Sequence, residues 1–248
     1  MPPTSPKLII LESVDSTNNY AMAMVQKGIA NNGEGVFAME QRSGKGRRGK
    51  TWKSQRGGNI LLSILAQMRW LPVQKQFHLS IAVALACLDF FSKYTKENIK
   101  IKWPNDIFIN DRKAGGILIE NVIKGNLWQW AIIGIGLNIN QENFEKDKLK
   151  ATSLKQITGG HYDVIQLSRE LHEIVLKRLS VLHSDELSKM LGEYNENLFC
   201  RNKRVKLKKG NIVFETEIDR VSASGELITK DVMERSFGFD EVQWMDLH

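Results

Sequence analysis

The stretch IKIKWPNDIFINDRKAGGILIENVIKGNLWQWAIIGIGLNI, residues 99–139, decides the fold. Apolar and polar residues alternate along it in four runs: Ile99–Trp103, Ile107–Ile109, Ala114–Glu120 and Leu127–Ile139. Alternation with a period of two is typical of strands that bury one face. Because strands joined by short turns pair antiparallel, this stretch predicts an antiparallel or mixed sheet rather than repeated strand–helix–strand units.

The flanks of this stretch predict further strands and the helices that cover the sheet. Strands are expected at 7–12, 35–40 and 59–67, and helices at about 19–27, 75–96, 164–182 and 185–196. Short strand patterns at 204–208, 213–221, 226–229 and 236–244 then predict a small β-barrel. The expected fold class is α+β, with a mixed, largely antiparallel sheet and helices packed on it. The expected domains are residues 1–197 and 198–248.

Composition indicates a globular protein without a membrane span. The chain is 42% hydrophobic and 25% charged, and no apolar run reaches the roughly 18 residues that cross a bilayer. No signal peptide is recognisable at the N-terminus. Cys87 and Cys200 lack C-x-x-C spacing, so we expect a buried thiol at Cys87 and a reducing, cytoplasmic compartment. The five histidines show no metal-ligand spacing, and no metal ligand is assigned among the side chains.

The net charge of +7 is concentrated in two basic clusters, Arg42–Lys53 and Arg201–Lys209. A basic surface is one mark of a nucleic-acid-binding module. The second cluster alternates basic and apolar residues like a half-exposed strand, so a solvated face is the favoured interpretation. The first cluster is rich in glycine, which favours a small anionic ligand. Neither cluster interleaves aromatic residues as stacking platforms for bases.

The first cluster contains GKGRRGKT, residues 44–51, which matches the P-loop pattern G-x-x-x-x-G-K-[ST]. A P-loop needs a helix that begins at its lysine and faces the phosphates. Residues 52–59 are polar, lack helical periodicity and contain two adjacent glycines, so we reject a P-loop NTPase. The glycines and four cations instead predict a mobile loop that orders around an anion. A flexible surface loop without a ligand is the alternative.

Three further segments carry unusual polar groups and glycines: KWPND at 102–106, RKAGGIL at 112–118 and GIGLNIN at 134–140. Glycines inside strands mark close backbone approach. Together with Ser16-Thr17-Asn18 at a helix start and the basic loop, these segments resemble the biotin protein ligase family. The resemblance covers about residues 8–248 and is most specific across 12–140.

The resemblance implies a set of ligand contacts. The residues implied to meet biotin are Ser16, Thr17, Asn18, Gln41, Lys45, Gly46, Arg47, Lys113, Gly115, Gly116 and Gly136. Those implied to meet ATP or the adenylate are Arg47, Arg48, Trp52, Asn105, Lys113 and Asn138. Arg47, Lys45 and Lys113 would offset charge at the reacting centres. Asp106 is our hypothesis for the group that orients or deprotonates the acceptor lysine.

The same resemblance implies the reaction and the fold. Biotin and ATP, with Mg²⁺, would give biotinyl-5′-AMP, and a lysine of a biotin carboxyl carrier domain would take the biotin. The expected fold is like that of biotin ligases and class II aminoacyl-tRNA synthetases, with an SH3-like C-terminal barrel. A homodimer through an exposed sheet edge is an open expectation.

Two departures from the family pattern change these expectations. Lys45 stands where arginine is usual, which keeps the charge but loses the planar fork of donors. Few residues precede the first strand, so no winged-helix domain, no repressor function and no DNA partner are expected.

Three rival functions remain open to test. A lipoate or octanoate ligase shares the core fold, but its arginine–glycine–histidine signature is missing here, and Ser16-Thr17-Asn18 favours a polar ring. A nucleic-acid-binding module is motivated by the charge alone. A catalytically inactive binding protein is disfavoured by the intact lysines and arginines.

Overall fold

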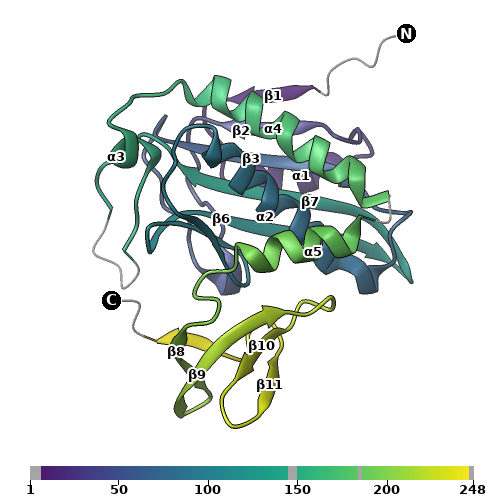
Figure 1. Ribbon diagram of the computed structural model, residues 1–248. Helices are drawn as coiled ribbons and strands as arrows, with labels where there is room; N and C mark the ends of the chain where they lie inside the picture. The colour runs from purple at the N-terminus through teal and green to yellow at the C-terminus, as the bar shows by residue number, and fades with distance from the viewer. Residues whose placement is uncertain (1–6, 145–149, 184–185, 246–248) are drawn as a thin grey trace.

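The computed structural model describes residues 7–144, 150–183 and 186–245, and it contains two sheets (Figure 1). The large sheet has the order β1-β2-β3-β7-β6-β5-β4. Its strands are β1 (Leu8–Leu11), β2 (Gly35–Ala38), β3 (Asn59–Gln67), β4 (Ile99–Lys102), β5 (Asp106–Ile109), β6 (Arg112–Lys124) and β7 (Leu127–Asn138). The β1–β2 pair is parallel and the other pairs are antiparallel. The predicted mixed, largely antiparallel sheet is therefore confirmed.

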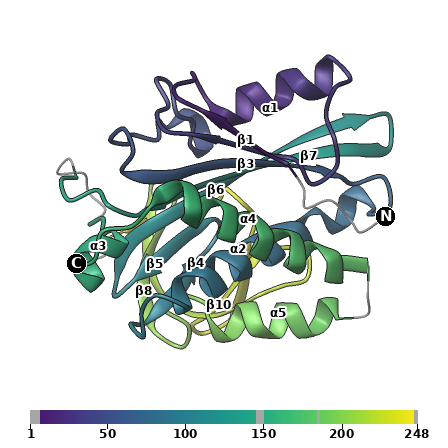
Figure 2. The same cartoon turned by 90° about the horizontal axis from the view of Figure 1, so that it is seen from above.

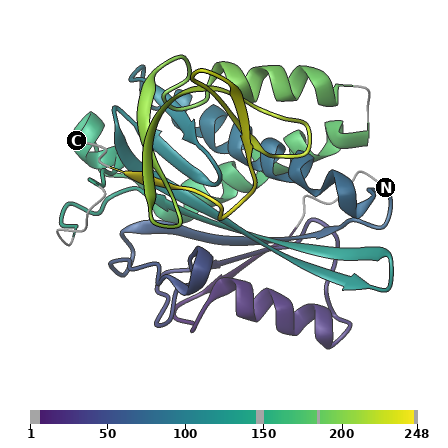
Figure 3. The same cartoon turned by 90° about the horizontal axis from the view of Figure 1, so that it is seen from below.

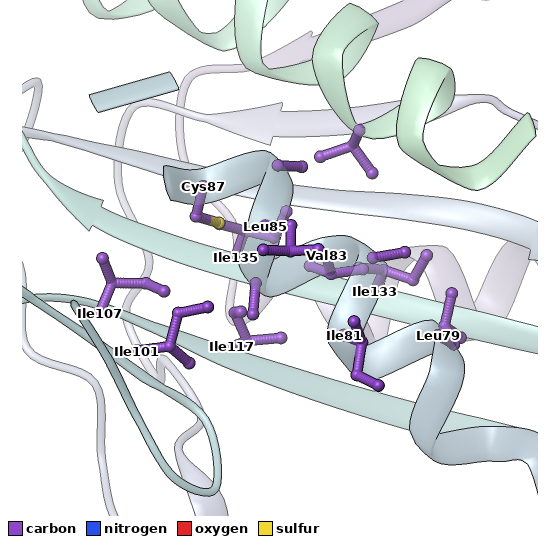
Figure 4. Packing of buried hydrophobic residues seen from close by; sticks show 14 of the residues in the cluster. Leu79, Ile81, Val83, Leu85, Cys87, Ile101, Ile107, Ile117, Ile133 and Ile135 are labelled. Carbon is purple, nitrogen blue, oxygen red and sulfur yellow. The ribbon is translucent and has the colours of Figure 1, made fainter. Parts of the chain in front are cut away.

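Helices cover both faces of the large sheet (Figure 2). Helix α1 (Thr17–Gln26) lies on one face, and α2 (Gln76–Ser92), α4 (Val164–Ser180) and α5 (Leu187–Glu196) lie on the other. The apolar residues of α2 pack against β-strand residues such as Ile133 and Ile135 (Figure 4). Strand β3 therefore buries residues on both of its faces, as a central strand does. No helix in the described part of the chain has the length and apolar character to cross a membrane.

The structure also corrects some local predictions. Strand β3 has the predicted bounds, whereas β6 is longer than the predicted run. The short helix α3 (Leu154–Thr158) was not predicted, because five residues are too few for a periodic pattern. The basic loop forms a single 3-10 turn, Arg47–Gly49, and no α-helix begins at Lys50. This absence removes the structural context of a P-loop, as the sequence predicted.

The C-terminal sheet has five antiparallel strands in the order β11-β10-β9-β8-β12 and curls strongly (Figure 3). They are β8 (Arg204–Lys209), β9 (Ile212–Val221), β10 (Leu227–Lys230), β11 (Glu234–Phe237) and β12 (Gln243–Met245). The single strand predicted at 236–244 is wrong. A turn with Asp240 at a φ of 76° separates β11 from β12. The predicted domain boundary at 197/198 falls between α5 and β8.

Trp103 joins the two sheets. Its side chain is 2% exposed, and its Nε1 donates a hydrogen bond of 2.9 Å to the carbonyl oxygen of Gly225. Its ring stacks on that of Phe239 in the β11–β12 turn, with centroids 5.6 Å apart and planes at 10°. Because Trp103 follows β4 directly, this contact fixes the C-terminal sheet against one end of the large sheet.

Candidate active site

A cavity of about 1460 Å³ opens between the large sheet, the basic loop and the C-terminal sheet. All predicted site residues except Gly115 line it: Ser16, Thr17, Asn18, Gln41, Lys45, Gly46, Arg47, Arg48, Trp52, Asn105, Asp106, Lys113, Gly116, Gly136 and Asn138. The segments that the sequence singled out separately therefore meet in one place. Gly115 faces the other way, and a Cβ there would lie 2.4 Å from Leu137 Cδ2.

The floor of the cavity is a row of residues that crosses five neighbouring strands. Lys102 on β4 pairs with Asp106 on β5, Asp106 with Gly116 on β6, Gly116 with Gly136 on β7, and Gly136 with Leu61 on β3. Residues directly opposite one another in a sheet point to the same face. The row therefore presents two charged groups, two glycines and an apolar side chain to the cavity.

Trp52 of the basic loop lies on the two glycines of this row. A Cβ at Gly136 would lie 2.7 Å from Trp52 Cε2, and a Cβ at Gly116 would lie 3.2 Å from Trp52 Cζ3. Only glycine leaves room for the indole at this distance from the strands. The indole Nε1 is buried and has no hydrogen-bond partner among the described residues. The floor is therefore a flat surface that takes a planar group.

One end of the cavity is polar and is organised around the start of α1. Gln41 Oε1 accepts hydrogen bonds from the Thr17 backbone N–H at 2.7 Å and the Thr17 hydroxyl at 3.0 Å. Ser63 Oγ lies 2.6 Å from Asn18 Oδ1, and Asn18 Nδ2 donates to Glu120 Oε2 at 2.7 Å. The side chain of Gln41 thus caps the N-terminus of α1.

Ser63 and Glu120 were not predicted as site residues. Ser63 interrupts the apolar run of β3 and is fully buried, and this interruption was a usable signal. Nothing in the sequence marked Glu120, because it ends a predicted strand in which apolar and polar residues alternate in the ordinary way. Lys45 Nζ lies 3.5 Å from a Glu120 carboxylate oxygen, which ties the atypical loop lysine to the polar end.

The opposite end of the cavity carries positive charge. Lys113 Nζ forms an ion pair of 2.7 Å with Asp106 Oδ1 and lies 5.7 Å from the centroid of the Trp52 ring. Arg47 Nη1 lies 3.4 Å from Asn105 Oδ1. Asn138 is buried, and its amide nitrogen donates to the carbonyl oxygen of Thr152 at 3.0 Å. Through this hydrogen bond Asn138 also stabilises the wall of the cavity.

The C-terminal sheet reaches the basic loop through one carboxylate that the sequence analysis missed. Asp240 accepts hydrogen bonds from Arg47 at 2.8 Å and from Arg48 at 2.6 Å. The Arg47 guanidinium also lies 5.5 Å from the centroid of the Phe239 ring. No motif could have signalled Asp240, because its role depends on how the two sheets are placed.

Lys102 belongs to the KWPND segment but was not predicted as a site residue. It is 6% exposed, and burial lowers the pKa of its ammonium to about 8. Asp106 opposes this shift, whereas Lys113 and Lys50 add to it. The cationic end therefore contains a buried ammonium group as well as the exposed arginines.

The cavity combines three kinds of surface in a line. Hydroxyl and amide groups line one end, glycines and Leu61 form a flat floor, and lysines and arginines gather at the other end. Such a site suits a long ligand with an uncharged polar head and an anionic tail. The cations could also hold a phosphate beside that tail.

Comparison with known proteins finds one matching family and several relatives. A profile of the Biotin/lipoate A/B protein ligase family matches residues 10–138, just over half of the chain. The Bifunctional ligase/repressor BirA of Bacillus spizizenii is 36% identical over 159 residues, which cover 63% of this chain and 48% of that protein. The Biotin--[acetyl-CoA-carboxylase] ligase of Mycobacterium tuberculosis is 32% identical over 151 residues, which cover 60% of this chain and 54% of that protein. The chain spans about half the length of these curated relatives.

Solved structures match over nearly the whole chain. The biotin protein ligase from Aquifex aeolicus, in complex with biotin and ATP, matches with a TM-score of 0.80 at 23% identity and covers 96% of this chain and 98% of its own. The biotin protein ligase from Leishmania major, in complex with biotinyl-5-AMP, matches with a TM-score of 0.62 at 23% identity and covers 96% of this chain. These structures establish the shared fold, and the profile match shows that the chain belongs to the Biotin/lipoate A/B protein ligase family.

Proposed function

We propose that this chain is a biotin protein ligase, which activates biotin with ATP and transfers it to a lysine of a biotin carboxyl carrier domain. The observation that carries the proposal is the single cavity that joins an uncharged polar end to a cationic end across a glycine floor. Relatives named as biotin ligases and solved complexes with biotin and ATP support the same reading.

The polar end fits the ureido ring of biotin. The ring is neutral and carries two N–H donors and one carbonyl acceptor, so it needs both kinds of partner. Thr17, Asn18 and Gln41 offer hydroxyl and amide groups in one hydrogen-bonded network. In this arrangement the valeryl chain would replace the Trp52 indole over Gly116 and Gly136, and its carboxylate would reach the cationic end.

In the first half-reaction, a carboxylate oxygen of biotin forms a bond to the α-phosphorus of ATP. The bond between that phosphorus and the oxygen bridging to the β-phosphate breaks, and pyrophosphate leaves. Two anions must approach each other, and negative charge builds up on the α-phosphate. Lys113 would offset this charge as a fixed cation, which typically contributes about 10²–10³ in rate, and Arg47 of the basic loop would add to it when the loop closes. The basic loop covers the mixed anhydride and limits its hydrolysis.

In the second half-reaction, the neutral amine of the acceptor lysine attacks the acyl carbon. An amide forms, AMP leaves with the bonding pair of the acyl–oxygen bond, and one proton is lost from the nitrogen. Asp106 lies on the cavity floor beside Lys113 and is placed to orient the incoming ammonium or to take its proton. In the absence of acceptor, its carboxylate holds Lys113.

Mg²⁺ is proposed to arrive with ATP. Among the described residues, Asp106 and Asp240 are the carboxylates that line the cavity, and both pair with cations. The same residues offer no cluster of three or more His, Cys, Asp and Glu side chains. Mg²⁺ would therefore be held chiefly by phosphate oxygens, whose charge it would reduce.

A homodimer stays a prediction. The edge strands of the large sheet are β1 and β4, and Ile101 of β4 exchanges backbone hydrogen bonds with Asn197 and Phe199. This contact occupies part of the β4 edge, so β1 is the edge that a second copy would use. Light scattering of the purified protein would decide the oligomeric state.

A lipoate ligase is the second candidate, because the matched family includes both activities. Pyrophosphate–ATP exchange separates them. We expect labelled pyrophosphate to enter ATP only when biotin is present, and lipoate not to replace it. Exchange that depends on lipoate, or on neither acid, would reject the proposal. As a control, the wild-type protein without any acid gives the background rate.

A further inference from the structure

We propose that Glu120 is a positioning residue that makes the polar end of the cavity select ligands carrying an N–H donor. This inference rests on the proposed function, because it explains how the site would recognise the ureido ring of biotin. Glu120 is not among the described residues that line the cavity. It would act through Asn18, which lines the cavity and whose amide Glu120 orients.

The Asn18 amide is held tightly between two strands. Its Nδ2 donates to Glu120 Oε2 at 2.7 Å and lies 3.3 Å from the carbonyl oxygen of Leu118, and both of these residues belong to β6. On β7, a Cβ at Gly134 would lie 2.4 Å from Asn18 Oδ1, so only glycine leaves room for the amide there. The amide therefore has two possible orientations, which differ in whether Nδ2 or Oδ1 faces Glu120.

Glu120 decides between these two orientations. The nitrogen and the oxygen of an amide are told apart by their hydrogen-bond partners. A carboxylate and a carbonyl oxygen accept hydrogen bonds and donate none, so Asn18 turns its Nδ2 toward Glu120 and Leu118. The opposite orientation would bring three oxygens together without a proton between them. Asn18 Oδ1 is therefore left facing Ser63, whose Oγ lies 2.6 Å away.

With Asn18 in this orientation, the hydroxyl network of the polar end is one proton short. Ser63 Oγ lies 2.6 Å from Asn18 Oδ1 and 2.8 Å from Thr17 Oγ1, and Thr17 Oγ1 lies 3.0 Å from Gln41 Oε1. Gln41 Oε1 also accepts from the Thr17 backbone N–H at 2.7 Å, so this atom is an acceptor. The three contacts between side-chain oxygens need three protons, and the hydroxyls of Ser63 and Thr17 supply two.

The missing proton is one that a ligand can supply. Whichever contact lacks it, one oxygen of that contact belongs to Thr17, Asn18 or Gln41, and all three residues line the cavity. A ligand N–H directed at that oxygen would supply the donor, whereas an ether oxygen would add a further acceptor. The ureido ring of biotin carries N–H groups, and the dithiolane ring of lipoate carries none. Glu120 would therefore favour a urea-like head group over that of lipoate.

Glu120→Gln would remove this selection and keep the size of the side chain. A glutamine amide donates as well as accepts, so Asn18 could then turn its Nδ2 toward Ser63. Ser63 would donate to Thr17, and Thr17 would donate to Gln41. All three contacts would hold a proton, and the network would no longer need one from the ligand.

The experiment compares ligands that differ in one N–H group. Isothermal titration calorimetry would measure the Kd of biotin and of its two cyclic carbamate analogues, in each of which one ureido N–H is replaced by oxygen. We expect one of the analogues to bind the wild type about 10- to 100-fold more weakly than biotin. In Glu120→Gln this ratio of Kd values should fall to about 3-fold or less. The ratio is the readout, because a general disturbance of the site raises both Kd values.

Two further variants complete the design. Glu34→Gln is the matched control, because Glu34 is buried and also accepts from an asparagine amide, that of Asn31, but is not among the described residues that line the cavity. Its ratio should equal that of the wild type. Glu120→Asp keeps a carboxylate that cannot donate, so its ratio should stay close to that of the wild type. It tests the inference even if Glu120→Gln fails to fold.

The possible results separate this inference from the proposed function. If Glu120→Gln weakens biotin and the analogues equally, Glu120 only stabilises the structure of the site, and the inference is overturned. Carbamates that bind the wild type as tightly as biotin would overturn it too, and so would a low ratio in Glu120→Asp. If wild-type protein binds biotin but catalyses no biotin-dependent exchange, the proposed function fails while the titrations still decide the role of Glu120.

Discussion

Two sets of cationic side chains line the cavity, and the protein holds them in different ways. Lys102 and Lys113 belong to β4 and β6 and are positioned by the strands of the large sheet, Lys102 buried and Lys113 partly exposed. Arg47 and Arg48 belong to the basic loop, and both rest on Asp240, which is half exposed. The sheet lysines are preorganised by their strands, whereas the loop arginines are held by exposed ion pairs that contribute little to stability.

This difference indicates that the two sets of cations have different functions in the site. Groups fixed on the sheet suit the chemical step, because they need no reorganisation when charge develops. Groups on an exposed loop suit covering and release, because exposed ion pairs typically contribute about 0–1 kcal/mol each and open easily. The following substitutions would break or sharpen this division.

The largest effect is expected from a sheet lysine. Lys113→Ala should lower the rate of biotin-dependent pyrophosphate–ATP exchange about 10²–10³-fold, because it removes the cation that we propose to act beside the reacting carboxylate. Lys124→Ala, at the exposed end of the same strand, is the control and should change the rate less than about 2-fold. Exchange at the wild-type rate in Lys113→Ala would remove this lysine from the mechanism.

The buried ammonium of Lys102 should leave a signature in the pH dependence of stability. Its pKa is lowered from 10.5 to about 8, so between these values the unfolded chain carries a proton that the folded chain lacks. The free energy of unfolding should therefore rise with pH across this window, by roughly 3 kcal/mol relative to Lys102→Met. Urea unfolding of both proteins from pH 7 to 10 measures the difference. The wild type and Lys102→Met share the other titratable groups that face position 102, which are Asp106, Lys113, Cys200 and Lys50.

The glycine floor should tolerate no side chain. A methyl group at Gly136 would lie 2.7 Å from the Trp52 ring, so Gly136→Ala should displace the indole and narrow the channel for the valeryl chain. We expect the Kd for biotin to rise roughly 10-fold by calorimetry. Gly192→Ala, in α5 with open space around the Cβ, is the control and should leave biotin binding unchanged. Equal biotin affinity in both variants would contradict the assigned path of the ligand.

The substitution of Asp240, which holds the basic loop, should give the smallest effect. Asp240→Asn removes the charge that holds Arg47 and Arg48, and we expect biotinyl-5′-AMP to leave about 2- to 5-fold faster. Glu234→Gln breaks an ion pair with Arg220 in the same sheet, away from the loop, and serves as the control. A slower release from Asp240→Asn would mean that Asp240 competes with the intermediate for the loop.

The sequence predicted most of the fold because its signals are local. The alternating runs at 99–139 predicted four strands joined by short turns in an antiparallel or mixed sheet, and the apolar pattern at about 75–96 predicted the helix α2. The turn at Asp240 escaped prediction because a left-handed residue within an alternating pattern has no local mark. Helix α3 escaped because its five residues make little more than one turn, too few to show a repeated amphipathic pattern.

The site was predictable where motifs carry it and not where two distant elements meet. The strand glycines and the basic loop were marked by the sequence pattern itself, and Lys113 was predicted from the resemblance to the biotin protein ligase family. Lys102 was missed because a lysine at the end of a strand is ordinarily exposed, whereas here its ammonium lies against Phe108 and Trp244, which come from two different sheets. Asp240 was missed because its partners lie far away in the sequence, on the opposite side of a junction between two sheets.

Single-turnover kinetics would test the division between sheet and loop most directly. Rapid mixing with limiting labelled biotin and excess ATP gives the rate at which biotinyl-5′-AMP forms, and a chase gives the rate at which it leaves. Lys113→Ala should slow formation about 10²–10³-fold with release unchanged. Asp240→Asn should change formation less than about 2-fold and speed release. If both substitutions altered the same rate by the same factor, the proposed division between fixed and mobile cations would be wrong.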